Sequence, residues 1–513
     1  MTDPFDDTAR DVVRRAYEAD PRPEAGDPAA ALARFRARSA DLPTDSAGQP
    51  VPAPSAETDA PAARAWRALG EQPSTVGPGT GRPPRPSASG AGIELRVDVH
   101  QNEYLPAGED QVDAVVTVTG AGTAPPSGHG HAEVIIVDCS ASMNNPPTKL
   151  AATRRAAAAA IDALTDGAAF AVIAGSDQAH AAYPAVGLAI ADDKTRAEAK
   201  LAVQQLSASG GTAFGRWLAL ADRLFADQPP GVRHAILLTD GRNDHETPAQ
   251  FAAALAACEG RFTCDCRGVG TGWHVEELRT IATTLLGTVD IVADPGGLAA
   301  DFQAMTAAAM GKTVADTSLQ LWTPPGAEVL FVKQVAPTVQ DLTGKRISSD
   351  RQHGDYPTGS WGAERREYHI RVHLRPGAIG DETLAAKISM TSGNQVLGEG
   401  RLKAIWTDDA DLSAEASPRI AHYTAQAELA ETIQDGLAAR QSGDLDTAAA
   451  KLGRAVQLAR QSGNTPTEKL LSKLVDAPMS GTARMKDKID EADAITLAVR
   501  SGSPRASGGG PSE

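Results

Sequence analysis

The chain has 513 residues, of which 42% are hydrophobic and 22% are charged. At roughly 100–200 residues per domain, this length predicts about two to four folded units rather than a single core. The 49 basic and 65 acidic residues give a net charge of −16. That balance disfavours binding to nucleic acid or to an anionic membrane, because both need clustered lysine and arginine. We expect cations, including metal ions, to be the natural electrostatic partners.

The sequence shows no pattern of export or membrane insertion. Its charged N-terminal segment lacks the apolar region of a secretory signal, and no apolar stretch approaches the roughly 18 residues of a membrane-spanning helix. Four cysteines are too few for a disulfide framework in so long a chain. We therefore expect a cytoplasmic protein with buried thiols, and a redox or soft-metal site is the alternative for the cysteines. They are Cys139, Cys258, Cys264 and Cys266.

Residues 1–91 differ in composition from the rest of the chain. They hold 14 of the 34 prolines of the whole chain. Such a segment has too few apolar side chains to offset the entropy lost on ordering. We expect a disordered Pro/Ala-rich region, and the alternative is a segment that folds when it docks on a partner.

Residues 92–124 predict the first β-strands. The segment IELRVDVH alternates apolar and polar side chains, and DAVVTVTG follows after a Pro-Ala-Gly turn. A lone hairpin is marginally stable in water. We therefore expect these strands to complete a group of strands formed later in the chain.

Residues 131–311 alternate apolar strands with helical stretches. This order predicts an α/β domain with a doubly wound, mostly parallel sheet and helices on both faces. The segment AEVIIVD is almost continuously apolar, as in a strand buried on both faces. Sheets of this kind carry their sites at the carboxyl ends of the strands. The other expected elements are strands at 169–174, 234–239, 262–270 and 288–292, a short edge strand at 186–190, and helices at 149–164, 194–206, 212–225 and 274–285.

The remaining segments predict a β-sandwich and a helical appendage. Residues 314–410 contain short alternating strands separated by Gly, Pro and Asp turns, so the α/β domain is expected as an insertion in a sandwich that begins at residues 92–124. Residues 411–500 are helical and include one helical hairpin that resembles the tetratricopeptide type. We expect this segment to pack on the core, and a peptide-binding array is the alternative. Residues 501–513 are expected to be a disordered tail.

Oxygen-bearing side chains gather at three strand ends of the α/β domain. Asp138, Ser140 and Ser142 stand at alternate positions in DCSAS, Thr212 follows two glycines, and Asp240 ends the strand HAILLTD. If the chain turns sharply after the first strand, side chains two residues apart can converge on one point. Hard divalent cations prefer such all-oxygen ligands in near-octahedral geometry at about 2.0–2.1 Å. The sequence therefore predicts a Mg²⁺ or Mn²⁺ site.

These motifs resemble those of a known family. DCSAS at 138–142, GGT at 210–212 and TDG at 239–241 resemble the metal-ion-dependent adhesion site (MIDAS) of the von Willebrand factor A (VWA) domain. The order of the motifs and the α/β span of about a third of the chain agree with that resemblance. The layout from residue 93 to residue 409 also resembles bacterial cytoplasmic proteins that carry this domain.

The resemblance implies a division of roles among the five residues. Ser140, Ser142 and Thr212 would coordinate the metal directly, Asp138 and Asp240 would act mostly through bound waters, and the sixth position would accept an Asp or Glu carboxylate from a partner protein. The resemblance also implies that engagement of the partner shifts the last helix of the domain.

Two residues depart from the family pattern, since Ala141 stands where glycine is common and Cys139 lies beside the first aspartate. Alanine costs little unless its position requires a positive φ. The cysteine is expected to be a core residue rather than a ligand.

We thus expect a non-enzymatic, divalent-metal-dependent protein-interaction module without catalytic residues. One alternative is a metal-dependent hydrolase that uses the same ion as a Lewis acid, with a general base from Asp244, His245 or Glu246. The other is a scaffold protein with a structural ion. His129 and His131 are interpreted as residues of a solvated linker, with a weak metal site as the alternative.

Overall fold

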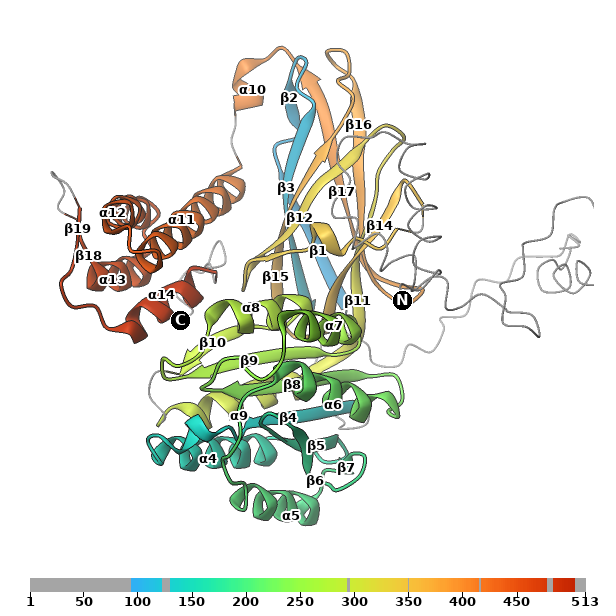
Figure 1. The fold of residues 1–513 in the computed structure, drawn as a ribbon. Helices are drawn as coiled ribbons and strands as arrows, with labels where there is room; N and C mark the ends of the chain where they lie inside the picture. Colours follow the sequence, from blue (N-terminus) through green and yellow to red (C-terminus); the bar gives the residue numbers. More distant parts are fainter. Residues whose placement is uncertain are drawn as a thin grey trace, which may run out of the picture. The chain divides into compact units, whose positions relative to one another are not determined.

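The computed structural model describes residues 94–121, 130–292, 296–348, 350–414, 417–477 and 483–502. The regions expected to be disordered, residues 1–91 and nearly all of 501–513, lie outside the described residues, as does His129. The described part of the chain forms a seven-stranded α/β sheet, two five-stranded sheets and a C-terminal helical segment (Figure 1).

The α/β sheet is built on two fully buried strands. All residues of β4 (His131–Asp138) and of β5 (Ala169–Gly175) are buried. The interpretation of His131 as a residue of a solvated linker is therefore wrong. The two strands pair in parallel, and β4 pairs in parallel with β8 (Val232–Thr239) on its other side. Burial on both faces explains why the centre of β4, Val134–Val137, is continuously apolar. The order is β10-β9-β8-β4-β5-β6, with β7 also paired to β5; the remaining strands are β6 (Ala179–Tyr183), β7 (Ala189–Ile190), β9 (Thr263–Val269) and β10 (Val289–Val292).

Helices cover both faces of this sheet (Figure 1). Alternate side chains of β4 serve opposite faces, because Val137 packs in one hydrophobic cluster and Ile136 in the other. The first cluster includes α4 (Thr148–Asp162), α5 (Asp193–Gln204) and α9 (Leu298–Met310). The second includes α6 (Phe214–Ala226), α7 (Pro248–Cys258) and α8 (Val275–Thr284). The predicted doubly wound α/β fold is confirmed.

The edge of the sheet differs from the prediction. The strand expected at 186–190 is only the two-residue β7 at Ala189–Ile190, and β6, which the sequence did not predict, pairs antiparallel with β5. The residues of β6 are half-buried or exposed. An edge strand with so little burial has no strong hydrophobic pattern, so the sequence carries little signal for it.

The remaining sheets pack as the expected β-sandwich. β3 pairs antiparallel with β1 and also with β15, which lies on the far side of the α/β domain in the chain. The α/β domain is therefore inserted in the sandwich, as predicted. One sheet has the order β1-β3-β15-β12-β13, with β1 (Glu94–Gln101), β3 (Gln111–Ala121), β12 (Glu328–Ala336), β13 (Gln340–Asp341) and β15 (Arg365–His373). The other has the order β14-β11-β16-β17-β2, with β2 (Tyr104–Pro106), β11 (Lys312–Trp322), β14 (His353–Gly362), β16 (Glu382–Ser392) and β17 (Gln395–Thr407).

Trp361 and Trp406 belong to the sandwich core rather than to an exposed patch. Both side chains are buried, and their indole N–H groups donate to Thr358 Oγ1 and to the main-chain oxygen of Glu109. A buried indole needs such a partner.

The C-terminal helices form a small core of their own and dock on the α/β domain. The hairpin predicted from the sequence consists of α11 (Pro418–Gln441) and α12 (Leu445–Gln461), which share one hydrophobic cluster with later helices. Ile495 and Val499 of α14 join the second cluster of the α/β domain, so the segment is a packed appendage. The other elements are η1 (Ala141–Asn144), η2 (Thr343–Lys345), α10 (Ala410–Ala414), α13 (Thr465–Leu474), β18 (Val475–Asp476), β19 (Arg484–Met485) and α14 (Glu491–Ser501).

The described ranges bear on two expectations from the sequence, which concern membrane-spanning helices and buried thiols. None of the helices in these ranges is long and apolar enough to cross a membrane. All four cysteines are buried free thiols. Burial raises the pKa of both Cys139 and Cys258 to about 12.

Candidate metal centre

Asp138 is the last residue of β4 and lies at the carboxyl end of the parallel strands. Its side chain is fully buried. The Ser140 N–H donates to Oδ1 over 2.7 Å, and the Thr239 hydroxyl donates to Oδ2 over 2.6 Å. Burial raises the pKa of Asp138 to about 6 although these hydrogen bonds lower it, and the nearby Asp240 raises it further. A neighbouring cation would favour the ionised form.

The two serines of the DCSAS motif meet because the chain turns directly after the strand. The short helix η1 begins at Ala141, and the turn brings the Ser140 and Ser142 hydroxyl oxygens to 2.9 Å from one another. The Ser142 hydroxyl donates to Asp240 Oδ1 over 2.6 Å. The sharp turn expected after the first strand is therefore present, and it joins this motif to the end of β8.

Thr212 reaches the same point from a third loop. A Cβ added to Gly241 would lie 2.7 Å from the Thr212 hydroxyl oxygen, 3.6 Å from Asp138 Oδ2 and 3.7 Å from Ser140 Oγ. One small volume beside Gly241 is therefore bordered by all three oxygen atoms. The five residues selected from the sequence are all brought together.

Glycines allow the Thr212 loop to approach. The main-chain oxygen of Gly210 accepts the Ala141 N–H over 2.9 Å, and its φ of 76° lies in the left-handed region that favours glycine. A Cβ on Gly211 would lie 1.9 Å from the His245 ring. Because neither glycine has a side chain, Asp177 and His245 can pack directly against the loop. This close packing holds Thr212, the next residue, in place.

Lys149 is a member of this cluster that sequence reasoning missed. Its ammonium nitrogen lies 2.6 Å from Asp240 Oδ2, and the Asp240 side chain is fully buried. The lysine stands in the first turn of α4, seven residues after Ser142, and a single lysine at such a position has no distinguishing sequence pattern. Two carboxylates and one ammonium give the cluster a formal charge of −1.

Two of the three candidate bases after Asp240, Asp244 and Glu246, accept hydrogen bonds around the Thr212 loop, and His245 contacts Asp244. Asp244 Oδ1 accepts from the Thr212 N–H over 3.3 Å and contacts His245 Nδ1 at 2.7 Å. Glu246 Oε1 accepts from the Gly215 N–H over 2.6 Å at the start of α6. Partial burial opposes the charge on Asp244, but the His245 contact and the Thr212 N–H outweigh it, so its pKa is lowered.

The donor set fits a hard cation. Carboxylate and hydroxyl oxygens from three loops are the ligands that Mg²⁺ and Mn²⁺ prefer. In the described ranges no group of three or more His, Cys, Asp or Glu residues is placed to hold a metal ion, and this cluster contains two carboxylates with three hydroxyls. The nitrogen- and sulfur-rich ligand sets typical of structural zinc differ from it.

The fold and the arrangement of strand-end motifs define an α/β domain of the von Willebrand factor A type. A family model for the von Willebrand factor type A domain matches residues 132–291, and a model for the von Willebrand factor type A C-terminal domain matches residues 457–501. A search of curated proteins found no match to the chain.

Solved structures extend the comparison beyond this domain. A von Willebrand factor type A protein from Catenulispora acidiphila is 49% identical, with a TM-score of 0.78, and the match covers 82% of this chain and 99% of that one. The chain therefore belongs to the von Willebrand factor type A family. The ArnB paralog VWA2 from Sulfolobus acidocaldarius is 13% identical with a TM-score of 0.49, covering 81% of this chain and 100% of that chain.

Members of this family commonly mediate protein–protein interactions and commonly bind a divalent metal ion at a MIDAS. Proximal thread matrix protein 1 of the mussel byssus, which is described with a zinc-occupied MIDAS motif, is 24% identical over 38% of this chain and 48% of that chain, with a TM-score of 0.31. A likeness at that level carries no argument about the ion used here.

Proposed function

We propose that this protein is a non-enzymatic interaction module that binds a partner through a Mg²⁺ or Mn²⁺ ion. The observation that carries the proposal is the convergence of three loops beside Gly241. Ser140, Ser142 and Thr212 would supply hydroxyl oxygens, and Asp138 and Asp240 would supply negative charge. The bound ion would act as a Lewis acid that accepts an Asp or Glu carboxylate from the partner.

Charge arithmetic supports an acidic partner. The cluster has a formal charge of −1 because Lys149 offsets one of the two aspartates. A divalent ion brings the total to +1, and this positive charge in a mostly buried site attracts a carboxylate. Without the lysine, the same cluster with its ion would be neutral. Lys149 is therefore expected to weaken metal binding while favouring an anionic ligand.

Isothermal titration of Mg²⁺ and Mn²⁺ into the full chain tests the metal step. Thr212→Ala removes one hydroxyl without touching a carboxylate, and we expect the affinity to fall at least about tenfold, a change of about 1.4 kcal/mol. Thr280→Ala, on the exposed face of α8, is the matched control and should bind metal as the wild type does. Absence of metal binding by the wild type would refute the proposal.

A pull-down from cell extract tests the partner step. Partner capture should require Mg²⁺ or Mn²⁺, should be lost with chelator, and should be weakened by Thr212→Ala but not by Thr280→Ala. Capture that is unchanged by chelator and by Thr212→Ala would instead support a scaffold with a structural ion. A cytoplasmic location is part of the proposal, and cell fractionation tests it.

Metal-dependent hydrolysis is a second candidate function. One observation favours it: His245 is half-exposed and its Nδ1 lies 2.7 Å from Asp244 Oδ1, next to the Thr212 loop. A carboxylate in this position can orient an imidazole as a general base. Turnover of a generic phosphoester by the wild type, lost in His245→Ala, would support this second function over the first.

A further inference from the structure

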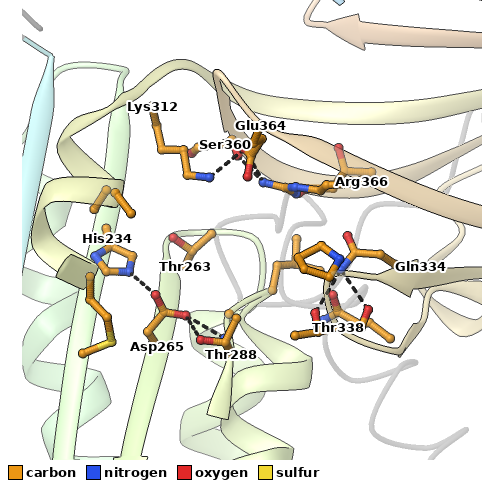
Figure 2. Close-up of a pocket in the computed structure, with 18 of the residues that line it drawn as sticks. His234, Thr263, Asp265, Thr288, Lys312, Gln334, Thr338, Ser360, Glu364 and Arg366 are labelled. Carbon is orange, nitrogen blue, oxygen red and sulfur yellow. Dashed lines mark hydrogen bonds and ion pairs between the residues drawn. The ribbon is translucent and has the colours of Figure 1, made fainter. Parts of the chain in front are cut away.

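A pocket lies at the opposite end of the parallel sheet from the candidate metal centre. It is lined by Val232, the first residue of β8, and by Thr263, the first residue of β9. With eight residues in β8 and roughly 3.3 Å of rise per residue, the two sites are about 25 Å apart along the strand. Side chains of the α/β domain and of the sandwich share the lining (Figure 2). We call it the junction pocket.

The size of the junction pocket suits a small molecule. Its volume is about 220 Å³. A single water needs roughly 10–15 Å³ on this measure, and pockets for drug-sized ligands start at about 300 Å³. The space therefore exceeds that of one or a few waters and is small for a drug-sized ligand, which leaves molecules of about the size of an amino acid.

The wall from the α/β domain includes two members of a buried three-residue charge group that is negative overall. His234 lies between two carboxylates, with Nδ1 at 2.9 Å from Glu133 and Nε2 at 3.1 Å from Asp265 Oδ2. Burial opposes charge on the imidazole, but Glu133 and Asp265 outweigh it and raise the pKa of His234 to about 10. One imidazolium against two carboxylates leaves a formal charge of −1. Asp265 faces the pocket, whereas Glu133 lies behind His234 and outside the lining.

The wall from the sandwich carries a net positive charge. Lys312 and Arg366 both contact Glu364 Oε1, at 2.6 and 2.9 Å, so two cations share one carboxylate and leave a formal charge of +1. Figure 2 shows both cations directed at Glu364, across the pocket from His234 and Asp265. An ammonium group has three N–H donors, of which Glu364 accepts one. Burial, with the nearby Arg366, lowers the pKa of Lys312 despite the Glu364 contact.

We propose that the junction pocket binds a small zwitterion of amino-acid size, with its carboxylate against Lys312 and Arg366 and its ammonium group against Asp265. The two charge groups have opposite net charges and so complement a molecule that carries both charges, whereas a purely anionic or purely cationic molecule would satisfy only one of them. Asp265 keeps capacity for this contact, because Thr288 and His234 supply three hydrogen bonds and a carboxylate accepts about four.

A ligand in this pocket would touch the connection between the two domains. Met305, Ala308 and Ala309 of α9 line the pocket, and Lys312 begins β11 two residues after that helix ends. Ligand binding would therefore stabilise the helix–strand connection together with both walls, and the folded chain should melt at a higher temperature when the pocket is filled.

Isothermal titration and thermal melting of the full chain, in the presence of chelator, test this proposal. The probes are glycine, L-alanine, L-serine and L-glutamate, each added alone, with acetate, methylamine and inorganic phosphate for comparison. We expect at least one amino acid to bind with one-to-one stoichiometry and to raise the melting temperature. Acetate and methylamine should each bind at least about tenfold more weakly, because each contacts one wall.

Two variants with matched controls locate the site. Lys312→Met removes a cation from the sandwich wall, and Lys333→Met, an exposed lysine of β12, is its control. Ala308→Phe adds a side chain at the rim of the pocket without changing charge, and Ala307→Phe, also exposed and outside the lining, is its control. We expect both pocket variants to lose amino-acid binding by at least about tenfold and both controls to retain it.

Three results would overturn the proposal: no amino acid binds at millimolar concentration, phosphate or acetate binds as tightly as the amino acids, or Lys312→Met and Ala308→Phe both bind normally. Because chelator is present throughout, none of these results bears on the metal centre. Failure of metal binding would likewise leave the junction pocket untouched.

Discussion

The two ends of the α/β sheet use charge in different ways. At the carboxyl end, three loops place hydroxyls and carboxylates around one small volume, and Lys149 offsets one of the two aspartates. At the amino end, His234 lies between two acids in a group of formal charge −1, and two cations share Glu364 in a group of formal charge +1, so the two groups offset each other. The carboxyl end therefore gathers the oxygen atoms that the proposed metal site requires, and the charge groups of the amino end lie where two domains meet.

The largest effect is expected from breaking the buried charge group at the amino end. Glu133→Ala leaves a buried imidazolium with Asp265 alone and should lower the free energy of unfolding by roughly 3–5 kcal/mol. Urea denaturation measures this change.

Lys200→Ala is the control for that experiment. It removes an exposed pair with Asp162 in the same domain and should cost roughly 0–1 kcal/mol. If both substitutions cost the same, the buried group does not stabilise the fold.

The pH dependence of the free energy of unfolding tests the same buried charge group without removing either carboxylate. Since the pKa of His234 is raised to about 10, its contribution is fully present below the unfolded value of about 6.5 and is lost as the pH rises towards 10. The free energy of unfolding of the wild type should fall across this range relative to His234→Asn, by up to about 1.4 kcal/mol for each unit of pKa difference.

Urea denaturation at a series of pH values gives both curves. His180→Asn, at an exposed histidine of β6, should follow the wild-type curve. Parallel curves for the wild type and His234→Asn would contradict the assignment of a charged His234.

At the carboxyl end, removing the internal cation should strengthen metal binding. Lys149→Met eliminates an ammonium group 2.6 Å from Asp240 Oδ2, so the affinity for Mg²⁺ should rise about tenfold, or about 1.4 kcal/mol. Isothermal titration measures the constant, with Lys194→Met at an exposed lysine of α5 as the control. An unchanged or lower affinity would show that the lysine does not compete with the ion.

The smallest effect concerns the thiol beside the metal centre. Cys139 is buried, and burial raises its pKa to about 12, so little thiolate exists near neutral pH. We expect iodoacetamide to leave Cys139 unmodified in the native chain and to label it after unfolding, as measured by mass spectrometry. Fast labelling of the native chain would mean that the carboxyl end is more open than its burial indicates.

Much of the candidate metal centre could be predicted because each of its motifs is local. The apolar run of β4, the serine pair spaced by two and the glycines before Thr212 are all patterns among near neighbours in the chain. Lys149 was missed because a single lysine in a helix has no distinguishing pattern, and only packing of α4 brings it to Asp240. β6 was missed because an exposed edge strand has no buried face to impose alternation.

The sequence by itself determined the α/β order, the insertion in a β-sandwich and the five oxygen-bearing residues of the candidate metal centre, since hydrophobic periodicity and residue type are properties of contiguous segments. Only the tertiary structure decided which charges meet. His234 and Glu133 are 101 residues apart, and Lys312 and Glu364 are 52 apart. Such pairs arise when separate elements pack, and no local pattern encodes the distance between them.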